Sequence, residues 1–169
     1  NDAVGHRPME ALKKPFAAVA TDLHSGEGIV FRSGNTGMAV RASSTVPGVF
    51  QPVSIAGHEY VDGGLSSLIP VRAARQMGAD VVIAVDISAR PADKQVRGTL
   101  EILLQTFAIM GQSLARYELK EADIVIRPQV GGVGSTDFQA RHDAILEGEK
   151  AAQAALPQIR EALRKAAGN

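Results

Sequence analysis

The five residues Val81-Val82-Ile83-Ala84-Val85 decide the fold class that this sequence predicts. They are apolar and mostly β-branched, without the alternation of a half-buried strand, so we expect a strand that is buried on both faces. After them, apolar residues recur at three- and four-residue spacing, which predicts a helix of about four turns or more; they are Leu100, Leu103, Leu104, Phe107, Met110 and Leu114. Ile124-Val125-Ile126 supplies the next strand. Strand, helix and strand in this order form the crossover unit of a parallel sheet, so we expect a three-layer α/β fold with a mainly parallel sheet flanked by helices.

Shorter elements are predicted on the amino-terminal side of this unit. The apolar runs Phe16 to Asp22 and Ile29 to Phe31 are joined by a glycine-punctuated connection of hairpin length, which indicates two antiparallel strands. Capping residues indicate a short helix between Gly34 and Ser44, and a second helix from Val71 to Met77 that Gly78 ends. We therefore expect a hairpin and two short helices before the parallel unit.

The carboxyl-terminal region is predicted to be helical. Ala140 to Leu156 and Gln158 to Ala167 form two helical stretches, and we expect Pro157 to break them because a proline inside a helix removes a backbone hydrogen bond. The glycine-rich link Gly131 to Ser135 is too short to separate two domains. Residues 1–169 are therefore expected to belong to one domain.

The composition is that of a globular protein without net charge. At 169 residues, with 45% apolar and 21% charged residues, the chain is long enough for a packed core. The 18 basic and 18 acidic residues cancel, so nucleic-acid binding is disfavoured. No cysteine is present, which excludes disulfides and thiolate chemistry. The longest apolar runs are far shorter than the roughly 18 residues of a membrane span.

The string Asp62-Gly63-Gly64 places a carboxylate at the end of a predicted strand. We expect left-handed or other Cβ-forbidden backbone angles at its glycines, which let other groups approach closely. Active groups of α/β sheets collect at the carboxyl ends of strands, and Asp22 and Asp86 also end apolar runs, so all three carboxylates could line one edge. The alternative is an ordinary turn at each position, and for Asp22 and Asp86 we favour turn or helix capping.

Four blocks of the sequence resemble a known family. In chain order they are Pro15 to Leu23, Arg41 to Val53, Asp62-Gly63-Gly64 and Gly78 to Asp86. Together they closely resemble the C-terminal portion of a bacterial patatin-like phospholipase. The most specific parts are the stretch Ala-Ser-Ser-Thr-Val-Pro-Gly-Val-Phe in the second block and the Asp-Gly-Gly string after it. The resemblance implies that residues 1–169 are the C-terminal part of a single patatin-like α/β hydrolase domain.

The resemblance implies an acyl hydrolase with a Ser-Asp dyad that acts on lipid esters of the phospholipid or lysophospholipid type. Asp62 matches the acid that accepts the proton of the nucleophilic serine, and Gly63 and Gly64 match the active-site loop. The family's serine lies upstream in a Gly-x-Ser-x-Gly elbow, and the closest serines here, Ser66 and Ser113, lack the second glycine. We therefore expect the chain to supply the base but not the nucleophile, to be inactive alone, and to need an N-terminal portion as partner.

The resemblance implies no metal or organic cofactor. The histidines show no metal-ligand spacing and are expected at the surface; they are His6, His24, His58 and His142. Expected partners are a lipid or acyl ester substrate and, through the exposed part of the stripe from Leu100 to Leu114, a membrane surface, although core packing is the favoured role of that stripe. The localisation stays open between cytoplasmic and exported, since a signal would lie upstream of Asn1.

Three alternatives stay open at this point. Ser67 stands where family members often carry an asparagine, which affects the loop geometry but not the identity of the acid. Ser43 and Ser44 are either pocket-lining groups or helix caps. The alternative function is a non-catalytic interaction or regulatory module that retains the hydrolase sheet and binds a partner.

Overall fold

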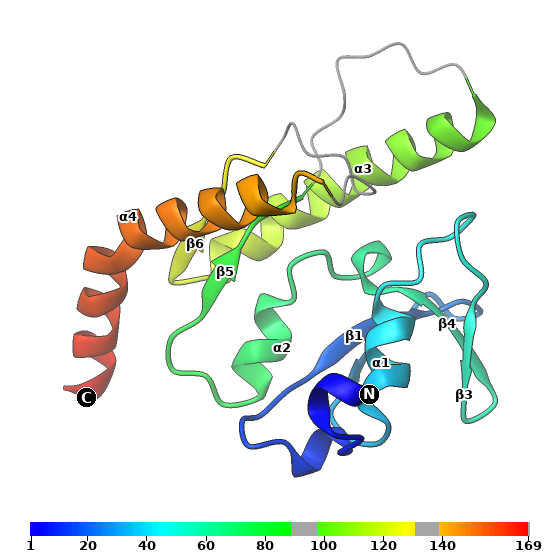
Figure 1. Ribbon diagram of the computed structural model, residues 1–169, viewed down its shortest axis with the longest axis horizontal. Coiled ribbons are helices and arrows are strands. Elements are labelled where there is room, and N and C mark those ends of the chain that lie inside the picture. The colour runs from blue at the N-terminus through cyan, green and yellow to red at the C-terminus, as the bar shows by residue number, and fades with distance from the viewer. Residues whose placement is uncertain (89–97, 131–138, 169) are drawn as a thin grey trace.

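The computed structural model describes residues 1–88, 98–130 and 139–168 of the chain. Figure 1 shows a sheet with a short helix in the amino-terminal half, and a pair of strands beside two long helices in the carboxyl-terminal half. Short 3₁₀ turns connect the larger elements; they are η1 (Asp2–Val4), η2 (Met9–Ala11), η3 (Gly63–Leu65) and η4 (Leu119–Glu121). The predicted link from Gly131 to Ser135 lies outside the described residues.

The amino-terminal half forms a four-stranded antiparallel sheet. Its strands are β1 (Ala18–Asp22), β2 (Gly28–Phe31), β3 (Val53–Ile55) and β4 (His58–Asp62), in the order β2-β1-β4-β3. The predicted hairpin is confirmed, because β1 and β2 pair in antiparallel register. All residues of β1 are buried, since this central strand has a neighbour on each side. The end of β4 is thereby held against the middle of the sheet.

Helix α1 (Thr36–Ser43) packs against this sheet and confirms the helix predicted between residues 34 and 44. The side chain of Asn35 caps it by accepting a hydrogen bond from the backbone N–H of Met38 at 2.9 Å. The core that the helix and the sheet share contains Ala20, Ala42, Val53 and Tyr60. Burial of these apolar side chains stabilises the half of the molecule that carries β4.

The predicted strand, helix and strand unit is confirmed. Strands β5 (Ile83–Val85) and β6 (Ile124–Ile126) pair in parallel, and helix α3 (Thr99–Glu118) lies between them in the chain. Before β5, helix α2 (Val71–Gln76) confirms the second predicted short helix, and Gly78 follows it with a left-handed φ of 90°. One core cluster joins α2, β5 and α3 through Val71, Ala84 and Ala115.

The prediction that this strand is buried on both faces is wrong for β5. Ala84 is buried, but Ile83 and Val85 are 39% and 52% exposed. Successive side chains of a strand point to opposite faces, so Ala84 faces α2 and α3 while Ile83 and Val85 face the other side. The helix on that side packs against Ile124 and Ile126 of β6 and leaves β5 partly open.

That helix is α4 (Arg141–Ala167), and the prediction that Pro157 breaks it is wrong. The helix is continuous through Pro157, although Figure 1 shows that it changes direction along its length. A proline inside a helix removes one hydrogen bond and bends the axis without necessarily ending it. Packing on β6 accounts for the continuity, because α4 contacts this strand from both sides of the proline; the contacting residues are Ala151, Ala152, Ala155, Ile159 and Ala162.

The α/β class is confirmed, since helices pack on both groups of strands. The described strands form one antiparallel sheet and one parallel pair, so an arrangement in three layers with a mainly parallel sheet is not confirmed. Within the three described ranges, no helix has the length and apolar character needed to cross a bilayer.

Candidate functional site

Asp62 is the last residue of β4 and caps the 3₁₀ turn η3. Its backbone is fixed on two sides. The Asp62 N–H donates to the carbonyl oxygen of Thr45 at 2.9 Å, and the Asp62 carbonyl accepts from Thr21 Oγ1 at 3.0 Å. The residue itself is half-buried. A half-buried carboxylate on a fixed backbone can meet a reacting group in one defined direction.

The two carboxylate oxygens of Asp62 differ in their surroundings. Oδ1 accepts a hydrogen bond from the backbone N–H of Gly64 at 2.8 Å. Oδ2 has no hydrogen-bond partner among the residues that the structure describes. One oxygen is therefore oriented by the loop, and the other is free to accept a proton from an additional group.

Of the two glycines after Asp62, Gly63 is required by close contact, and neither is required by its backbone angle. Neither has a positive φ, so the expected left-handed angles are absent and that prediction is wrong. A Cβ atom on Gly63 would lie 2.1 Å from the carbonyl oxygen of Val19, and one on Gly64 would lie 3.0 Å from Leu68 Cδ1. The loop can lie on β1 only because position 63 has no side chain.

A pair of hydroxyl groups lies beneath the loop. Thr21 Oγ1 and Ser66 Oγ are 2.8 Å apart, and Ser66 Oγ also donates to the Gly63 carbonyl at 3.3 Å. Thr21 is 5% exposed, so these bonds form away from bulk water. Sequence reasoning considered Ser66 only as a nucleophile and missed Thr21, because the register between β1 and β4 that brings Thr21 beside Val61 has no local signal.

Asp22 is a turn-capping residue, as favoured from the sequence. Its Oδ1 accepts from the backbone N–H groups of His24 and Ser25 at 2.9 Å each, and its Oδ2 lies 3.0 Å from His58 Nδ1. The hydrogen bond from the Ser25 backbone, which outweighs the opposite effect of burial, lowers the pKa of Asp22 to about 2, and His24 and His58 add to this. Both of its oxygens are occupied.

Asp86 is also occupied at both oxygens. Oδ1 accepts from the Ser88 backbone N–H at 3.1 Å, and Oδ2 accepts from Arg127 Nε at 3.2 Å. Burial raises the pKa of Asp86, but the hydrogen bonds from Ser88 and the nearby Arg127 outweigh it and leave this pKa below its usual value. This arrangement agrees with the favoured structural role for Asp86.

The three carboxylates do not line one edge, so that expectation is wrong. Strands β1 and β4 are antiparallel, with Asp22 opposite Tyr60 and Ala20 opposite Asp62. Asp22 and Asp62 therefore lie toward opposite ends of the paired strands, and Asp86 follows a strand of the separate parallel pair. The rule on carboxyl ends applies to parallel strands, and the prediction failed because these two strands are antiparallel.

Apolar side chains are exposed beside the Asp62 loop. Gly48, with a φ of 81°, lies against α3, where an added Cβ would be 3.3 Å from Leu100 Cδ1 and 3.9 Å from Leu103 Cδ2. The neighbouring Val49 and Phe50 are 51% and 61% exposed, and Leu100 and Leu103 are 47% and 40% exposed. The turn that supplies the Thr45 carbonyl to Asp62 thus continues into an open apolar surface.

The apolar stripe from Leu100 to Leu114 on α3, for which core packing was favoured, is only partly buried. Gly111 and Ala115 are the buried residues of this helix, while Met110 is 59% exposed. The side of α3 that faces away from the core is largely apolar and has no charged residue from 102 to 115, after which the exposed Arg116 follows; its exposed apolar members include Ile102, Leu103, Ile109, Met110 and Tyr117.

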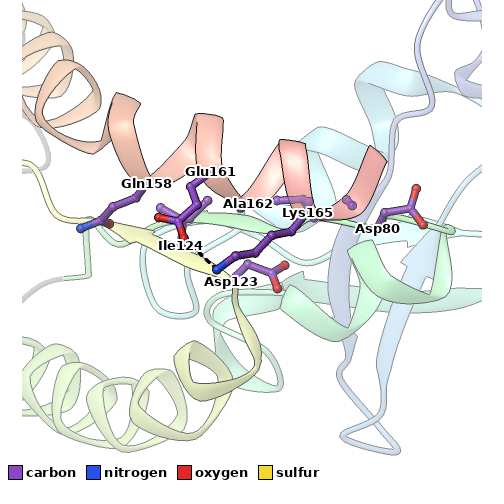
Figure 2. A pocket seen from close by; sticks show the side chains of 9 residues that line it. Asp80, Asp123, Ile124, Gln158, Glu161, Ala162 and Lys165 are labelled. Atoms are coloured by element: carbon purple, nitrogen blue, oxygen red, sulfur yellow. Dashed lines mark ion pairs between the residues drawn. The ribbon is translucent and has the colours of Figure 1, made fainter. Parts of the chain in front are cut away.

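A separate hollow of about 500 Å³ lies between α4 and the amino ends of β5 and β6 (Figure 2). Three of its four charged side chains are paired: Lys165 binds Glu161 at 2.8 Å, and Asp123 accepts from the Val82 N–H at 2.7 Å and from Arg75, while Asp80 is exposed. Asp62 does not line it. This hollow therefore has no part in the chemistry of the Asp62 loop.

Ser44, His58 and His24 have structural partners. Ser44 Oγ donates to the Val40 carbonyl at 3.0 Å, which supports the capping role at the end of α1. His58, at the start of β4, is exposed beside Asp22, and His24 lies 3.2 Å from Glu59. Across the described part of the chain, no group of three or more acidic or histidine residues is placed to hold a metal ion.

Comparisons with known proteins agree with the resemblance predicted from the sequence. The family model described as "Patatin-like phospholipase" matches residues 3–75, which include the Asp62 loop. An uncharacterized NTE family protein of Mycobacterium tuberculosis is 37% identical over 91 residues, which cover 54% of this chain and 25% of that protein. Another from Mycobacterium bovis is 29% identical over 180 residues, which cover 90% of this chain and 30% of that protein.

A mammalian protein is also similar to part of the chain. Patatin-like phospholipase domain-containing protein 7 of Mus musculus is 37% identical over 86 residues, which cover 50% of this chain and 6% of that protein. The chain thus spans less than a third of the length of each of these relatives. The recognised resemblance is confirmed by these matches.

Proposed function

Because this chain belongs to the patatin-like phospholipase family, we propose that it is part of a longer protein that hydrolyses carboxylic esters of lipids. In this proposal Asp62 is the general base of a Ser-Asp dyad. The nucleophilic serine and the backbone groups that hold the oxyanion lie outside these 169 residues. The chain alone is then inactive, because a base without a nucleophile has nothing to activate.

The free oxygen of Asp62 is the observation that carries this proposal. Asp22 and Asp86 also follow strands, but each uses both carboxylate oxygens in hydrogen bonds. Asp62 uses only Oδ1, through Gly64, and among the described residues nothing occupies Oδ2. A general base needs an unoccupied oxygen at a fixed position, and of these three carboxylates Asp62 alone meets that requirement.

The proposed reaction proceeds through an acyl-enzyme. Asp62 Oδ2 accepts the serine proton while the serine oxygen bonds to the ester carbonyl carbon. The ester C–O bond then breaks, and the leaving alcohol takes the proton from Asp62. A water molecule, deprotonated by Asp62 in the same way, attacks the acyl group, and the proton returns to the serine oxygen as the fatty acid leaves. The hydrogen bond from Gly64 to Oδ1 keeps the carboxylate from rotating during both steps.

The apolar surface beside the loop supports a lipid as substrate. Val49, Phe50, Leu100 and Leu103 are all at least 40% exposed and border the turn that binds the Asp62 backbone. We propose that this surface contacts the acyl chain, because burial of apolar area is the main source of affinity for such a group. The largely apolar outer side of α3 continues the surface and is proposed to contact the membrane from which the lipid is taken.

We propose that the portion bearing the serine also completes the sheet. Ile83 and Val85 of β5 are partly exposed, whereas strands of parallel sheets are covered on both faces. A further layer over β5 would bury these side chains and give the three-layer, mainly parallel sheet of a patatin-like domain. The absent portion is thus proposed as a partner of this chain as well as the source of the nucleophile.

A fluorophosphonate probe, which bonds covalently to activated serines, tests the proposed function. The longer protein is expected to be labelled at one serine outside these 169 residues, and Asp62→Asn is expected to slow the labelling while Asp86→Asn leaves it unchanged. Absence of labelling in the folded longer protein would favour the alternative, a non-catalytic module that keeps the hydrolase sheet and binds a partner.

A further inference from the structure

Glu118 connects the end of α3 to the loop that follows Asp62. Its carboxylate accepts two hydrogen bonds from that loop, one from Ser67 Oγ and one from the backbone N–H of Ile69 at 2.8 Å. Glu118 is the last residue of α3 and lies 51 positions from Ser67 in the chain. Both oxygens of a half-buried carboxylate are thus used to hold one short segment.

The side chain between these two contacts packs on the same helix. Leu68 lies between Gly64 and Gly111, since a Cβ added to either glycine would come within 3.2 Å of a Leu68 methyl carbon. Gly111 is buried on the face of α3 that is turned toward the core. The glycine at position 111 therefore lets α3 approach the loop closely enough for Glu118 to reach its backbone.

Hydrogen bonds within the loop connect Ser67 to Asp62. The Gly63 carbonyl accepts from the N–H groups of Ser66 and Ser67 at 3.1 and 2.8 Å, which makes residues 63–67 one compact turn. Gly64, inside this turn, donates to Asp62 Oδ1. A displacement at Ser67 would therefore move the N–H group that orients the Asp62 carboxylate.

We propose that Glu118 is a positioning residue that sets the direction of Asp62 Oδ2 by holding the far end of this loop on α3. The inference rests on the proposed function, since it concerns the same base. Loss of the Glu118 carboxylate would leave the Ile69 N–H without its partner and release Ser67 and Leu68 from α3. Catalysis depends on sub-ångström placement of a base, so the chemical step should suffer more than substrate binding.

Kinetics of the longer protein with a soluble acyl ester test this role. Glu118→Ala is expected to lower kcat by about tenfold or more with KM unchanged. Glu118→Gln is expected to recover most of the rate, because its amide oxygen still accepts from the Ile69 N–H. Glu121→Ala is the matched control, since Glu121 lies three residues farther on and binds Arg72 of α2 at 2.9 Å instead of a residue of the 63–69 loop. It is expected to keep kcat.

The outcomes separate this inference from the proposed function. If Asp62→Asn keeps the wild-type kcat, the proposed function itself fails. If Asp62→Asn is inactive and Glu118→Ala keeps kcat, or if Glu118→Ala and Glu121→Ala lower it equally, the positioning role is overturned. Should Glu118→Ala not fold, Ser67→Ala takes its place, with an expected loss of about threefold or more in kcat; an unchanged kcat in that variant overturns the role as well.

Discussion

Gly63 and Val19 are in backbone contact, because a Cβ atom at position 63 would lie 2.1 Å from the Val19 carbonyl oxygen. Asp62 pairs with Ala20, the residue after Val19, so this contact lies directly beside the candidate base. No side chain fits there without displacing a fully buried strand. The position of the Asp62 carboxylate therefore depends on a glycine that cannot be exchanged.

Gly63→Ala is expected to lower the free energy of unfolding by about 3 kcal/mol or more, since β1 or the loop must move to admit the methyl group. Gly148→Ala is the matched control. Gly148 lies inside α4 with no atom within 4 Å of an added Cβ, so alanine there should raise stability by about 0.5–1 kcal/mol. Urea unfolding of both variants measures these changes. Equal changes in the free energy of unfolding would contradict the close contact between Gly63 and Val19.

The Asp22 carboxylate should make stability depend on pH. Its pKa is about 2 in the folded protein and 3.8 ordinarily, so the unfolded chain binds the proton more readily. Its contribution is then complete above the ordinary pKa and is lost as the pH falls from 3.8 toward 2. Asp22→Asn is expected to lower the urea midpoint near neutral pH, and the difference from wild type should shrink on acidification through this window.

Asp80→Asn serves as the control for this measurement, because Asp80 is exposed and, within the described ranges, its backbone carbonyl but not its side chain is hydrogen-bonded. Its urea midpoint should follow that of the wild type at every pH. A difference between wild type and Asp22→Asn that stays constant down to the lowest pH would show that the Asp22 carboxylate does not stabilise the hairpin turn.

Elements with a local signal could be predicted from the sequence. The hairpin of β1 and β2 and the parallel pair of β5 and β6 follow from apolar runs and the turns between them. The pairing of β4 with β1 has no such signal, since about 40 residues separate Ala20 from Asp62. For the same reason Thr21 and Glu118 were missed, because only the folded chain brings them to the loop.

The solvent exposure of individual side chains was the property that the sequence predicted least well. The pattern Val81 to Val85 indicates a strand but does not say which faces are covered, and α4 covers β6 more than β5. Asp62 could be named as the candidate acid from the resemblance alone. What distinguishes it from Asp22 and Asp86 is an unoccupied oxygen within the described part of the chain, which results from contacts that form only in the folded protein.

The outer side of α3 is expected to bind phospholipid vesicles. Replacing Ile109 and Met110, which are 51% and 59% exposed, by glutamate should weaken binding to neutral phosphatidylcholine vesicles about tenfold or more, because two apolar side chains no longer enter the interface. Ile145→Glu is the control, since Ile145 is 63% exposed on α4. Equal losses in the two variants, measured by vesicle co-sedimentation, would contradict a specific role for α3.

The most direct test is the turnover of Asp62→Asn in the longer protein, compared with Asp86→Asn and with wild type on a chromogenic acyl ester. Asparagine keeps the shape of the side chain and removes its capacity to accept a proton, so kcat should fall by about 10²- to 10⁴-fold. Asp86→Asn should retain activity, because among the described residues the Asp86 carboxylate binds Ser88 and Arg127, away from the Asp62 loop. An Asp62→Asn variant that folds and turns over at the wild-type rate would contradict the assignment of Asp62 as the catalytic base.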